Sequence, residues 1–368
     1  MRVLVFGMSA DKFGGIESFL LNMNRHMNGE CIFDYVIVGK SCIYEDKVKA
    51  GGGKVFYTTP YSQNPLKHLK ELRQIVKECR DTHKTAYFNL FSMVHLIPVM
   101  LCERYGYKIV FHSHNSSIPK RGAIDPYRLL HAIGRKLYGG KKNITRLTCA
   151  PKAAEFMFGK GKNRSARMIY NAVEPDRFRF SPEARESIKN ELGFSGKKVI
   201  GFAGRLEQQK NPLFLIDIFE EIAKKDDACR FLILGDGSMR PAIEEAILKK
   251  GLGDLVCLLQ PRPDIEKFYS AMDLFLLPSL FEGLPVVLVE TQANGLLSLV
   301  SSEAVPREAE VREGFIIFCD HKSSAKDWAN AAICALDMRR DRYEWNDAVK
   351  KSHFDIDTEA GKLKEVLS

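Results

Sequence analysis

Two glutamates, Glu282 and Glu290, lie eight positions apart in the segment PSLFEGLPVVLVETQANG (278–295). The apolar run 273–279 before them is typical of a buried parallel strand, and Pro285 suits the first turn of a following helix. A carboxylate accepts hydrogen bonds from two adjacent hydroxyls, so one glutamate could hold a hexose and the other a ribose. The same spacing is also compatible with two solvated charges at a helix end.

The residues between that strand and helix predict an anion site. Gly283 permits a sharp turn, and the first-turn amides that follow it, near Leu284, would face an anion together with the positive end of the helix dipole. Glu282 would then lie in the loop above the anion, with Glu290 about one and a half turns into the helix. The segment therefore predicts a diphosphate site next to two sugar-binding carboxylates.

Arg205 and Lys210 follow another apolar strand, VIGFAG, and could reach one diphosphate from a single loop. Two cations would stabilise a nucleoside-diphosphate leaving group, which is the work of a divalent metal in other transferases. Because no Asp-x-Asp element lies near the predicted cleft, we expect no metal requirement. The alternative is a helix-capping or surface pair. Gly235, a candidate donor-binding residue, belongs to a Gly-Asp-Gly sequence whose simplest role is a turn.

The first half carries weaker candidates. Gly14 and Gly15 follow the first strand and permit close backbone approach to a phosphate or sugar, although paired glycines are common in plain turns. His112 and His114 flank Ser113 at the end of the strand KIVF. Alternation along a strand points both histidines to the same side, and the sequence leaves open which of them faces the site. A structural hydrogen-bonding role is the alternative for each.

These motifs resemble the family 4 retaining glycosyltransferases, which have the GT-B fold and an E-x7-E element. The resemblance runs along most of the chain, and within the family it points to the EpsF-like subgroup that builds exopolysaccharide and capsule repeat units. The segments that carry it are GGIESFLLNMNRHM (14–27), FHSHNS (111–116), GRLEQQKNPLFLIDIF (204–219), LILGDGSMR (232–240) and FEGLPVVLVETQANGL (281–296).

The resemblance implies a role for each matching residue. His114 would hydrogen-bond the transferring sugar, Glu282 would hold its 3- and 4-hydroxyls, and Glu290 would hold the ribose. Arg205, Lys210 and the amides near Leu284 would carry the phosphate charge. Arg262, in LLQPRPDI (258–265), occupies the place where the family lines the nucleotide base, and the Gly14–Gly15 loop would lie against the donor and shape the acceptor site.

The implied reaction is metal-independent transfer of a hexosyl or N-acetylhexosaminyl group, with retention, from a nucleotide sugar with UDP as the preferred carrier. The acceptor would be a hydroxyl of a glycan or a polyprenyl-diphosphate-linked oligosaccharide in bacterial surface polysaccharide synthesis. No other cofactor is implied. Leu297 and Ser298 stand where the family often has proline and a small residue, and Ala150 stands where a serine is frequent, which weakens any assignment of the sugar.

Strand and helix patterns alternate twice along the 368 residues, which predicts an α/β fold of two Rossmann-like domains with parallel sheets facing across a cleft. We expect an N-terminal acceptor-side domain at 1–172, a C-terminal donor-binding domain at 173–353, and a last helix, about 354–368, that packs back on the first domain. Pro175, Pro182 and a run of charges are expected to interrupt regular structure at 171–185. The predicted strands are 1–7, 33–39, 53–58, 107–114, 197–205, 229–237, 254–260, 273–279 and 296–302.

The formal net charge is +9, and basic runs at 119–121, 141–146 and 160–164 concentrate it in the first half. Nucleic acid is not expected as a partner, because no aromatic-basic ladder is present. Anionic phospholipid at the inner face of the cell membrane fits better, and a generally basic solvated surface is the alternative. Without a long apolar run or a signal-peptide pattern, the protein is expected in the cytoplasm, with its nine cysteines reduced and buried.

Three other classes are less compatible with the sequence. A nucleotide-sugar 2-epimerase shares the two-domain architecture, but its acid/base carboxylate and histidine motifs are not found. A non-catalytic partner subunit would have no reason to keep Arg205, Lys210, Glu282, Glu290 and His114 together. A dehydrogenase would need G-x-G-x-x-G after the first strand, where GMSADKFGG stands instead.

Overall fold

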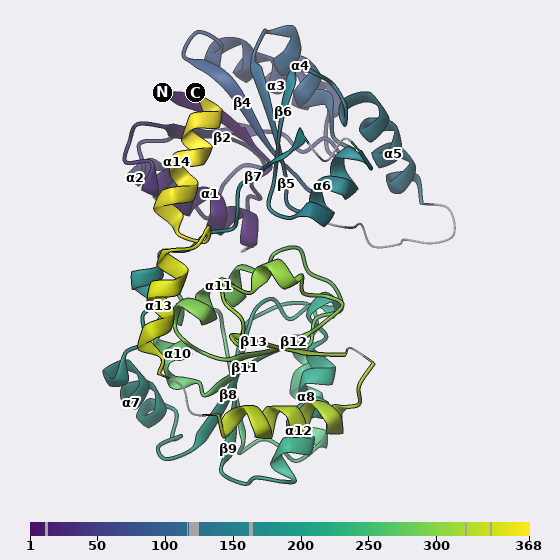
Figure 1. Ribbon diagram of the computed structural model, residues 1–368. Helices are drawn as coiled ribbons and strands as arrows, with labels where there is room; N and C mark the ends of the chain where they lie inside the picture. Colours follow the sequence, from purple (N-terminus) through teal and green to yellow (C-terminus); the bar gives the residue numbers. More distant parts are fainter. Residues whose placement is uncertain (12–13, 116, 118–124, 162–164, 321, 339–340) are drawn as a thin grey trace. The chain divides into compact units, whose positions relative to one another are not determined.

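The computed structural model describes residues 1–11, 14–115, 117, 125–161, 165–320, 322–338 and 341–368. The chain forms two compact units (Figure 1). The first contains residues 1–171 together with 356–368, and the second contains residues 172–355. Each has a parallel sheet with helices packed against it.

The first unit is built on a seven-stranded parallel sheet in the order β3-β2-β1-β4-β5-β6-β7. The chain leaves β1 toward β3 and then returns to β4 on the other side of β1, so the direction of strand order reverses between β1 and β4. The strands are β1 (Arg2–Phe6), β2 (Ile32–Val38), β3 (Val55–Thr58), β4 (His83–Leu90), β5 (Lys108–Ser113), β6 (Ile144–Thr148) and β7 (Arg167–Met168).

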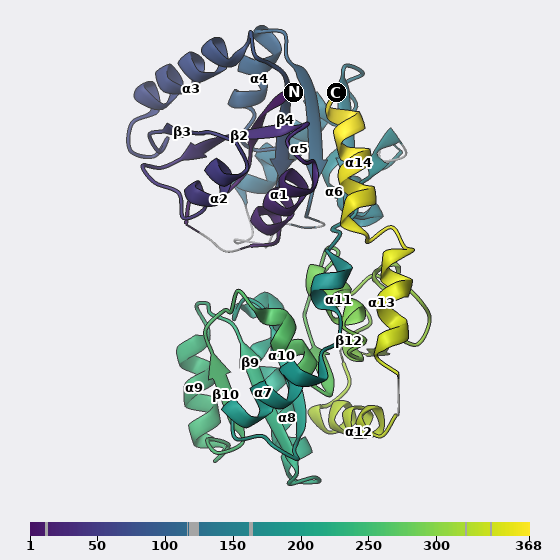
Figure 2. The same ribbon diagram turned by 90° about the vertical axis from the view of Figure 1, so that its left-hand side faces the viewer.

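Seven helices belong to this unit among its described residues. The last of them, α14, comes from the C-terminus and packs beside α1 in both views (Figures 1 and 2). Its terminal turn is held by a hydrogen bond of 2.9 Å from Thr85 Oγ1 to the carbonyl of Leu367. The helices are α1 (Gly15–His26), α2 (Glu45–Ala50), α3 (Pro65–Cys79), α4 (Ile97–Arg104), α5 (Pro126–Tyr138), α6 (Pro151–Phe158) and α14 (Ile356–Leu367).

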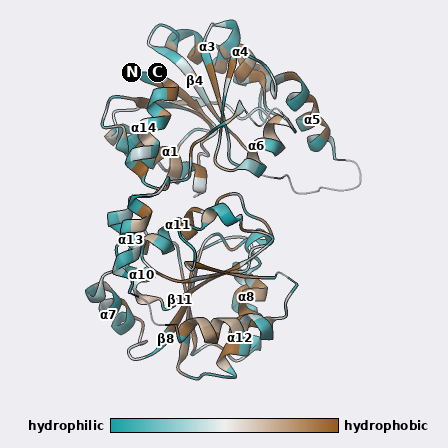
Figure 3. Ribbon diagram, in the orientation of Figure 1, coloured by the Kyte–Doolittle hydropathy of each residue, from teal (hydrophilic) through white to brown (hydrophobic). Residues whose placement is uncertain are grey.

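The second unit repeats the same logic with six parallel strands in the order β10-β9-β8-β11-β12-β13. Its strand order reverses between β8 and β11, and these central strands are strongly hydrophobic (Figure 3). The strands are β8 (Lys198–Ala203), β9 (Cys229–Leu234), β10 (Val256–Leu259), β11 (Leu274–Leu277), β12 (Ser298–Ser301) and β13 (Ile316–Cys319). The helices are η2 (Pro175–Phe178), α7 (Pro182–Glu191), η3 (Gln208–Lys210), α8 (Pro212–Ala223), α9 (Arg240–Lys249), α10 (Ile265–Ala271), α11 (Val286–Ala293), η4 (Arg307–Ala309), α12 (Ala325–Leu336) and α13 (Tyr343–Lys350).

The predicted strands are all present, and the structure adds four, β4, β6, β7 and β13. Strand β4 has the sequence HKTAYFNL, in which polar side chains interrupt the apolar pattern, so the sequence did not predict a buried strand. Every residue of β4 except Lys84 is nevertheless buried. The prediction for 171–185 is wrong in part. A 3-10 helix occupies Pro175–Phe178, and Pro182 begins α7 at a position where proline is compatible with a helix.

Six of the nine cysteines are buried, whereas Cys334 is exposed, which corrects the expectation that all are buried. Within the described ranges, none of the helices has the length and apolar content needed to cross a bilayer.

The loops after β8 and β9 approach so closely that they require glycine. A Cβ on Gly235 would lie 2.0 Å from the carbonyl oxygen of Gly204, which is backbone and cannot rotate away. We expect Gly235→Ala to lower the free energy of unfolding by about 1 to 3 kcal/mol, because the two loops must separate. Gly253→Ala is the matched control, since an added Cβ there meets nothing within 4 Å. Urea denaturation of both variants tests this, and equal stability would contradict the close-approach argument.

Candidate functional site

The carboxyl ends of β8 and β11 carry three of the charged residues that the sequence singles out in the second unit. Arg205 and Lys210 follow β8, and Glu282 follows β11, its neighbour in the sheet. Because strand order reverses between these two strands, the helices after them leave on opposite faces and the loops border a crevice at the sheet edge. Topology therefore brings together residues more than 70 positions apart in sequence.

Lys210 and Glu282 form a direct ion pair. Lys210 Nζ lies 2.6 Å from Glu282 Oε1, and the two side chains are only 13% and 5% exposed. An ammonium has three donors, so this contact leaves Lys210 capacity to donate to a ligand. The pair can thus place a cation and a hydrogen-bond acceptor side by side, which suits a phosphate next to a sugar hydroxyl.

The loops that carry this pair are tied together. Gln209 accepts a hydrogen bond of 2.8 Å from the Leu280 amide and donates one of 2.9 Å to the Phe281 carbonyl. A third loop joins them, because Glu207 accepts hydrogen bonds from the Ser238 amide (3.0 Å) and hydroxyl (2.6 Å). Arg205 is exposed, and one of its nitrogens lies 3.4 Å from the side-chain oxygen of Gln209.

The helix after Glu282 begins one residue later than predicted. Pro285 is the N-cap residue with extended backbone, and α11 starts at Val286. Gly283 and the buried Leu284 form the turn that leads into it. The start of this helix still presents first-turn amides, which have no acceptor within the helix itself.

Glu290 lies within α11 and accepts a hydrogen bond of 2.7 Å from the hydroxyl of Tyr269. Burial raises the pKa of Glu290 above its ordinary value, and the hydrogen bond from Tyr269 opposes that rise. The tyrosine therefore fixes the orientation of the carboxylate that the resemblance assigns to a ribose. Sequence reasoning missed Tyr269, whose only signal is a polar aromatic residue on the buried side of α10.

Two other predicted donor contacts differ in character. Gly235 is buried and is needed for loop packing, as described above. Arg262 is exposed, pairs with Asp264 at 3.1 Å, and lies over the ring of Phe268 with its guanidinium carbon 5.2 Å from the ring centroid. The guanidinium is therefore already engaged by Asp264 and by Phe268 of α10, so stacking on a base would require it to turn from Phe268.

In the first unit, His112 and His114 are both buried at the end of β5, and their ring centroids are 4.1 Å apart. His112 Nδ1 lies 2.5 Å from the Tyr87 hydroxyl, and His114 Nε2 lies 2.9 Å from Asn89 Oδ1. Phe19 of α1 contacts both rings edge-on. His114 keeps 9% exposure and His112 none, so the more accessible ring is that of His114.

The environment makes both histidines neutral. Burial lowers the pKa of His114 to about 3, and burial together with the neighbouring ring of His114 lowers the pKa of His112 well below its ordinary value. The amide nitrogen of Asn89 donates to the Phe6 carbonyl at 3.4 Å, so Asn89 Oδ1 is the acceptor and His114 Nε2 carries the proton. Asn89 lies on β4, which the sequence pattern did not reveal.

The loop after β1 is shaped by Gly14 and by a buried glutamate that the sequence reasoning did not single out. Glu17, 3% exposed, accepts a hydrogen bond of 2.9 Å from the Ser9 amide. A Cβ on Gly14 would lie 2.5 Å from Glu17 Oε2, so a larger residue there would require the glutamate side chain to move, whereas a Cβ on Gly15 would meet nothing within 4 Å. The sequence signal that could have identified Glu17 was an acidic residue at the start of an amphipathic helix. Lys12 and Phe13 lie outside the described residues.

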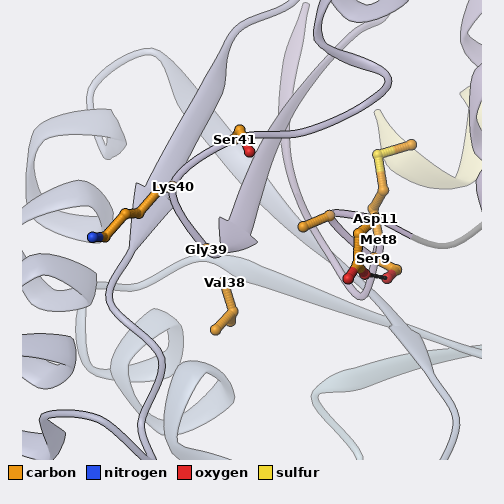
Figure 4. A pocket seen from close by; sticks show the side chains of 8 residues that line it. Met8, Ser9, Asp11, Val38, Gly39, Lys40 and Ser41 are labelled. Atoms are coloured by element: carbon orange, nitrogen blue, oxygen red, sulfur yellow. Dashed lines mark hydrogen bonds between the residues drawn. The ribbon is translucent and has the colours of Figure 1, made fainter.

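A shallow pocket of about 490 Å³ opens beside this loop at the carboxyl ends of β1 and β2 (Figure 4). Ser9 and Asp11 lie on one side of it, with a hydrogen bond of 3.3 Å between them, and Lys40 lies on the other. Its remaining lining residues are Met8, Ala10, Val38, Gly39 and Ser41. Hydroxyl, carboxylate and ammonium groups around an open hollow suit a polar ligand such as a sugar.

Comparison with known proteins relates these features to described families. Residues 184–352, almost all of the second unit, match the family model for glycosyl transferases group 1. EpsF of Bacillus subtilis, provisionally named a glycosyltransferase, is 26% identical over 371 residues, covering 96% of this chain and 93% of that protein.

Two further relatives are informative. A stretch of 144 residues is 33% identical to the UDP-Gal:α-D-GlcNAc-diphosphoundecaprenol α-1,3-galactosyltransferase of Escherichia coli, covering 37% of this chain and 36% of that enzyme. The crystal structure of HepE from Anabaena in complex with UDP-glucose superimposes with a TM-score of 0.81 at 17% identity, covering 100% of this chain and 99% of HepE.

The Lys210–Glu282 pair should couple energetically. Lys210→Met leaves a buried carboxylate without its cation and is expected to destabilise the second unit by about 3 kcal/mol or more. Lys210→Met/Glu282→Gln removes both charges and should cost less than the sum of the two single changes. Urea denaturation of the four proteins gives the coupling energy, and strictly additive effects would show that the two side chains do not interact.

His114 should stay neutral across the physiological range. Its folded pKa lies below the unfolded value of about 6.5, so the unfolded chain binds more protons and the histidine weakens the fold as pH falls below about 6.5. In histidine-labelled protein, with the signal identified by His114→Gln, the NMR shifts of His114 are expected to remain constant from pH 8 to about pH 5. A titration with a midpoint near the ordinary value would contradict the burial argument.

Proposed function

Because this chain is a glycosyltransferase of the group 1 type with the GT-B fold, we propose that it transfers a hexosyl or N-acetylhexosaminyl group from a UDP-sugar. The acceptor is a hydroxyl of a glycan or a lipid-linked oligosaccharide in bacterial surface polysaccharide synthesis. The observation that carries the proposal is the buried Lys210–Glu282 pair at the β8–β11 crevice.

The donor site is proposed in the second unit. Lys210 and Arg205 bind the diphosphate from the loop after β8, and the first-turn amides of α11, near Leu284, add to the positive potential. Glu282 accepts hydrogen bonds from the hexose hydroxyls, and Glu290, oriented by Tyr269, accepts those of the ribose. The UDP-glucose complex of HepE and the UDP-galactose named for the Escherichia coli relative support UDP as the carrier.

The proposed reaction retains the configuration of the anomeric carbon. The bond from that carbon to the diphosphate oxygen breaks, and the acceptor oxygen forms a new bond on the same face through an oxocarbenium-like state. The departing phosphate accepts the acceptor's proton, so no side chain has to act as a nucleophile. His114, neutral and with its orientation set by Asn89, serves as a hydrogen-bonding group for the transferring sugar.

The proposed reaction is metal-independent, and the same arrangement supports this part of the proposal. Lys210 and Arg205 supply two positive charges where the leaving diphosphate gains negative charge, which is the contribution that a divalent ion makes elsewhere. The acceptor is proposed to bind near the pocket between the loops after β1 and β2, where Ser9, Asp11 and Lys40 offer polar contacts. The diphosphoundecaprenol in the name of the Escherichia coli relative supports a lipid-linked acceptor.

Calorimetric titration with UDP in the presence of EDTA tests the donor site. The wild-type chain is expected to bind UDP, and Lys210→Ala should weaken binding by about 10-fold to 100-fold, because a charge-assisted hydrogen bond to phosphate is lost. Lys249→Ala removes the same charge from the exposed end of α9 and should bind as the wild type does.

The outcomes separate the alternatives. Binding of UDP only after magnesium is added would overturn metal independence, and no binding of UDP or any other nucleoside diphosphate would overturn the donor site. If UDP binds, incubation of UDP-sugars without acceptor should release no epimer. With a diphosphoundecaprenol-linked sugar added, NMR of the product should show the anomeric configuration of the donor.

A further inference from the structure

Helix α5 (Pro126–Tyr138) exposes a row of large apolar side chains. Leu129, Ile133 and Leu137 follow one another at intervals of four residues, so they line one side of the helix, and they are 64%, 47% and 62% exposed. Leu130, beside this apolar row, is 50% exposed. Such a contiguous surface is rare on a helix that faces only water and marks an interaction site.

The opposite side of α5 is firmly packed, so the apolar row has no path into the core. His131, Gly134 and Tyr138 are buried. A Cβ on Gly134 would lie 2.0 Å from the Met93 carbonyl oxygen, which shows how closely the helix approaches the chain beneath it. His131 Nδ1 also accepts a hydrogen bond of 3.0 Å from the Met93 amide.

A basic row runs beside the apolar row. Arg128 and Lys136 are both exposed and lie eight residues apart, with Ala132 between them at the same spacing of four. The helix itself contains no acidic residue. Hydrophobic and hydrophilic residues alternate around α5 in Figure 3, which also shows it at the outer edge of its unit. An apolar row flanked by cations is the arrangement of a helix that lies in a membrane interface.

A small basic pocket of about 220 Å³ adjoins the basic row. Arg135, Lys136 and Lys160 line it, together with Ala132, Phe158 and Gly159. Arg135 lies 3.5 Å from the Phe156 carbonyl, and Lys160 makes a long contact of 3.9 Å with Glu155. Three cations around one hollow next to an apolar surface match a phosphate group whose acyl chains continue along the helix.

The basic runs singled out in the sequence extend this surface only in part. Residues 119–121 and 162–164 lie outside the described residues, whereas Lys142 and Lys160 are described and exposed. The interaction surface therefore consists of α5 and the basic pocket.

We propose that α5 lies in the interface of an anionic phospholipid bilayer, with the apolar row entering the acyl boundary and the basic pocket holding a lipid phosphate. This deepens the proposed function, because a lipid-linked acceptor would be met at that surface, but vesicle binding itself requires no transfer. The positive charge of this surface favours an anionic membrane over a protein partner. Cations directly beside the apolar row complement anionic headgroups, whereas the core of a protein interface is depleted of charge.

Vesicle co-sedimentation of the full chain tests the proposal. The wild type is expected to bind vesicles that contain phosphatidylglycerol, to bind pure phosphatidylcholine much more weakly, and to dissociate as salt is raised. Leu129→Ser/Ile133→Ser/Leu137→Ser should raise the lipid concentration for half-binding by at least about ten-fold. Arg128→Gln/Lys136→Gln should raise it roughly five-fold for each charge removed.

Matched controls lie on other helices. Leu66→Ser/Leu248→Ser removes two apolar side chains that are 81% and 77% exposed, and Lys70→Gln/Lys77→Gln removes two exposed cations from α3. Both should bind vesicles as the wild type does. All variants should keep the thermal midpoint and UDP affinity of the wild type, so a failure of the donor site and a failure of the membrane face remain distinguishable.

Three results would overturn the proposal. The first is no binding of the wild type to anionic vesicles, and the second is unchanged binding of the α5 variants. The third is a dimer in sedimentation velocity that the serine variant abolishes while vesicles are not bound, since the face would then belong to a second copy of this chain.

Discussion

The reversal of strand order in each parallel sheet is the constraint on which the remainder of this structure depends. Between β8 and β11, as between β1 and β4, the helices that follow the two strands leave on opposite faces. The carboxyl ends at that point cannot be covered by either helix, so loops border a crevice there. Polar residues in those loops are brought together by topology, whatever their distance in the sequence, and Lys210 meets Glu282 for this reason.

Burial then decides the electrostatics at these strand ends. Lys210 and Glu282 are held as a pair in loops that are themselves joined by hydrogen bonds, so charge is present where solvent is scarce. His112 and His114 are neutral for a related reason, because burial strips water from the imidazolium and lowers the pKa of both rings. Both units therefore place hydrogen-bonding groups at the ends of their strands, and burial holds the two histidines neutral.

Helix α5 illustrates the opposite balance. Its inner side is fixed by Gly134 and His131, and its outer side keeps apolar residues in water. An exposed leucine contributes little burial free energy to the fold, so a polar residue would serve the stability of the helix nearly equally well at these positions. An apolar surface retained beside cations is therefore more economically explained by an external contact than by the stability of the fold.

The sequence by itself determined the two Rossmann-like halves, because apolar strands with glycine-rich ends carry a local signal. Its motifs carried the resemblance to EpsF-like glycosyltransferases, which implied the GT-B fold. It also marked the strand-end residues, whose proposed roles still rest on that resemblance. Only the tertiary structure decided the hydrogen-bond partners of the buried polar residues. The polar strand β4 is buried because Asn89 and Thr85 find acceptors far along the chain, and Tyr269 reaches Glu290 from another helix. Such hydrogen bonds join residues distant in sequence, so no local pattern can encode them.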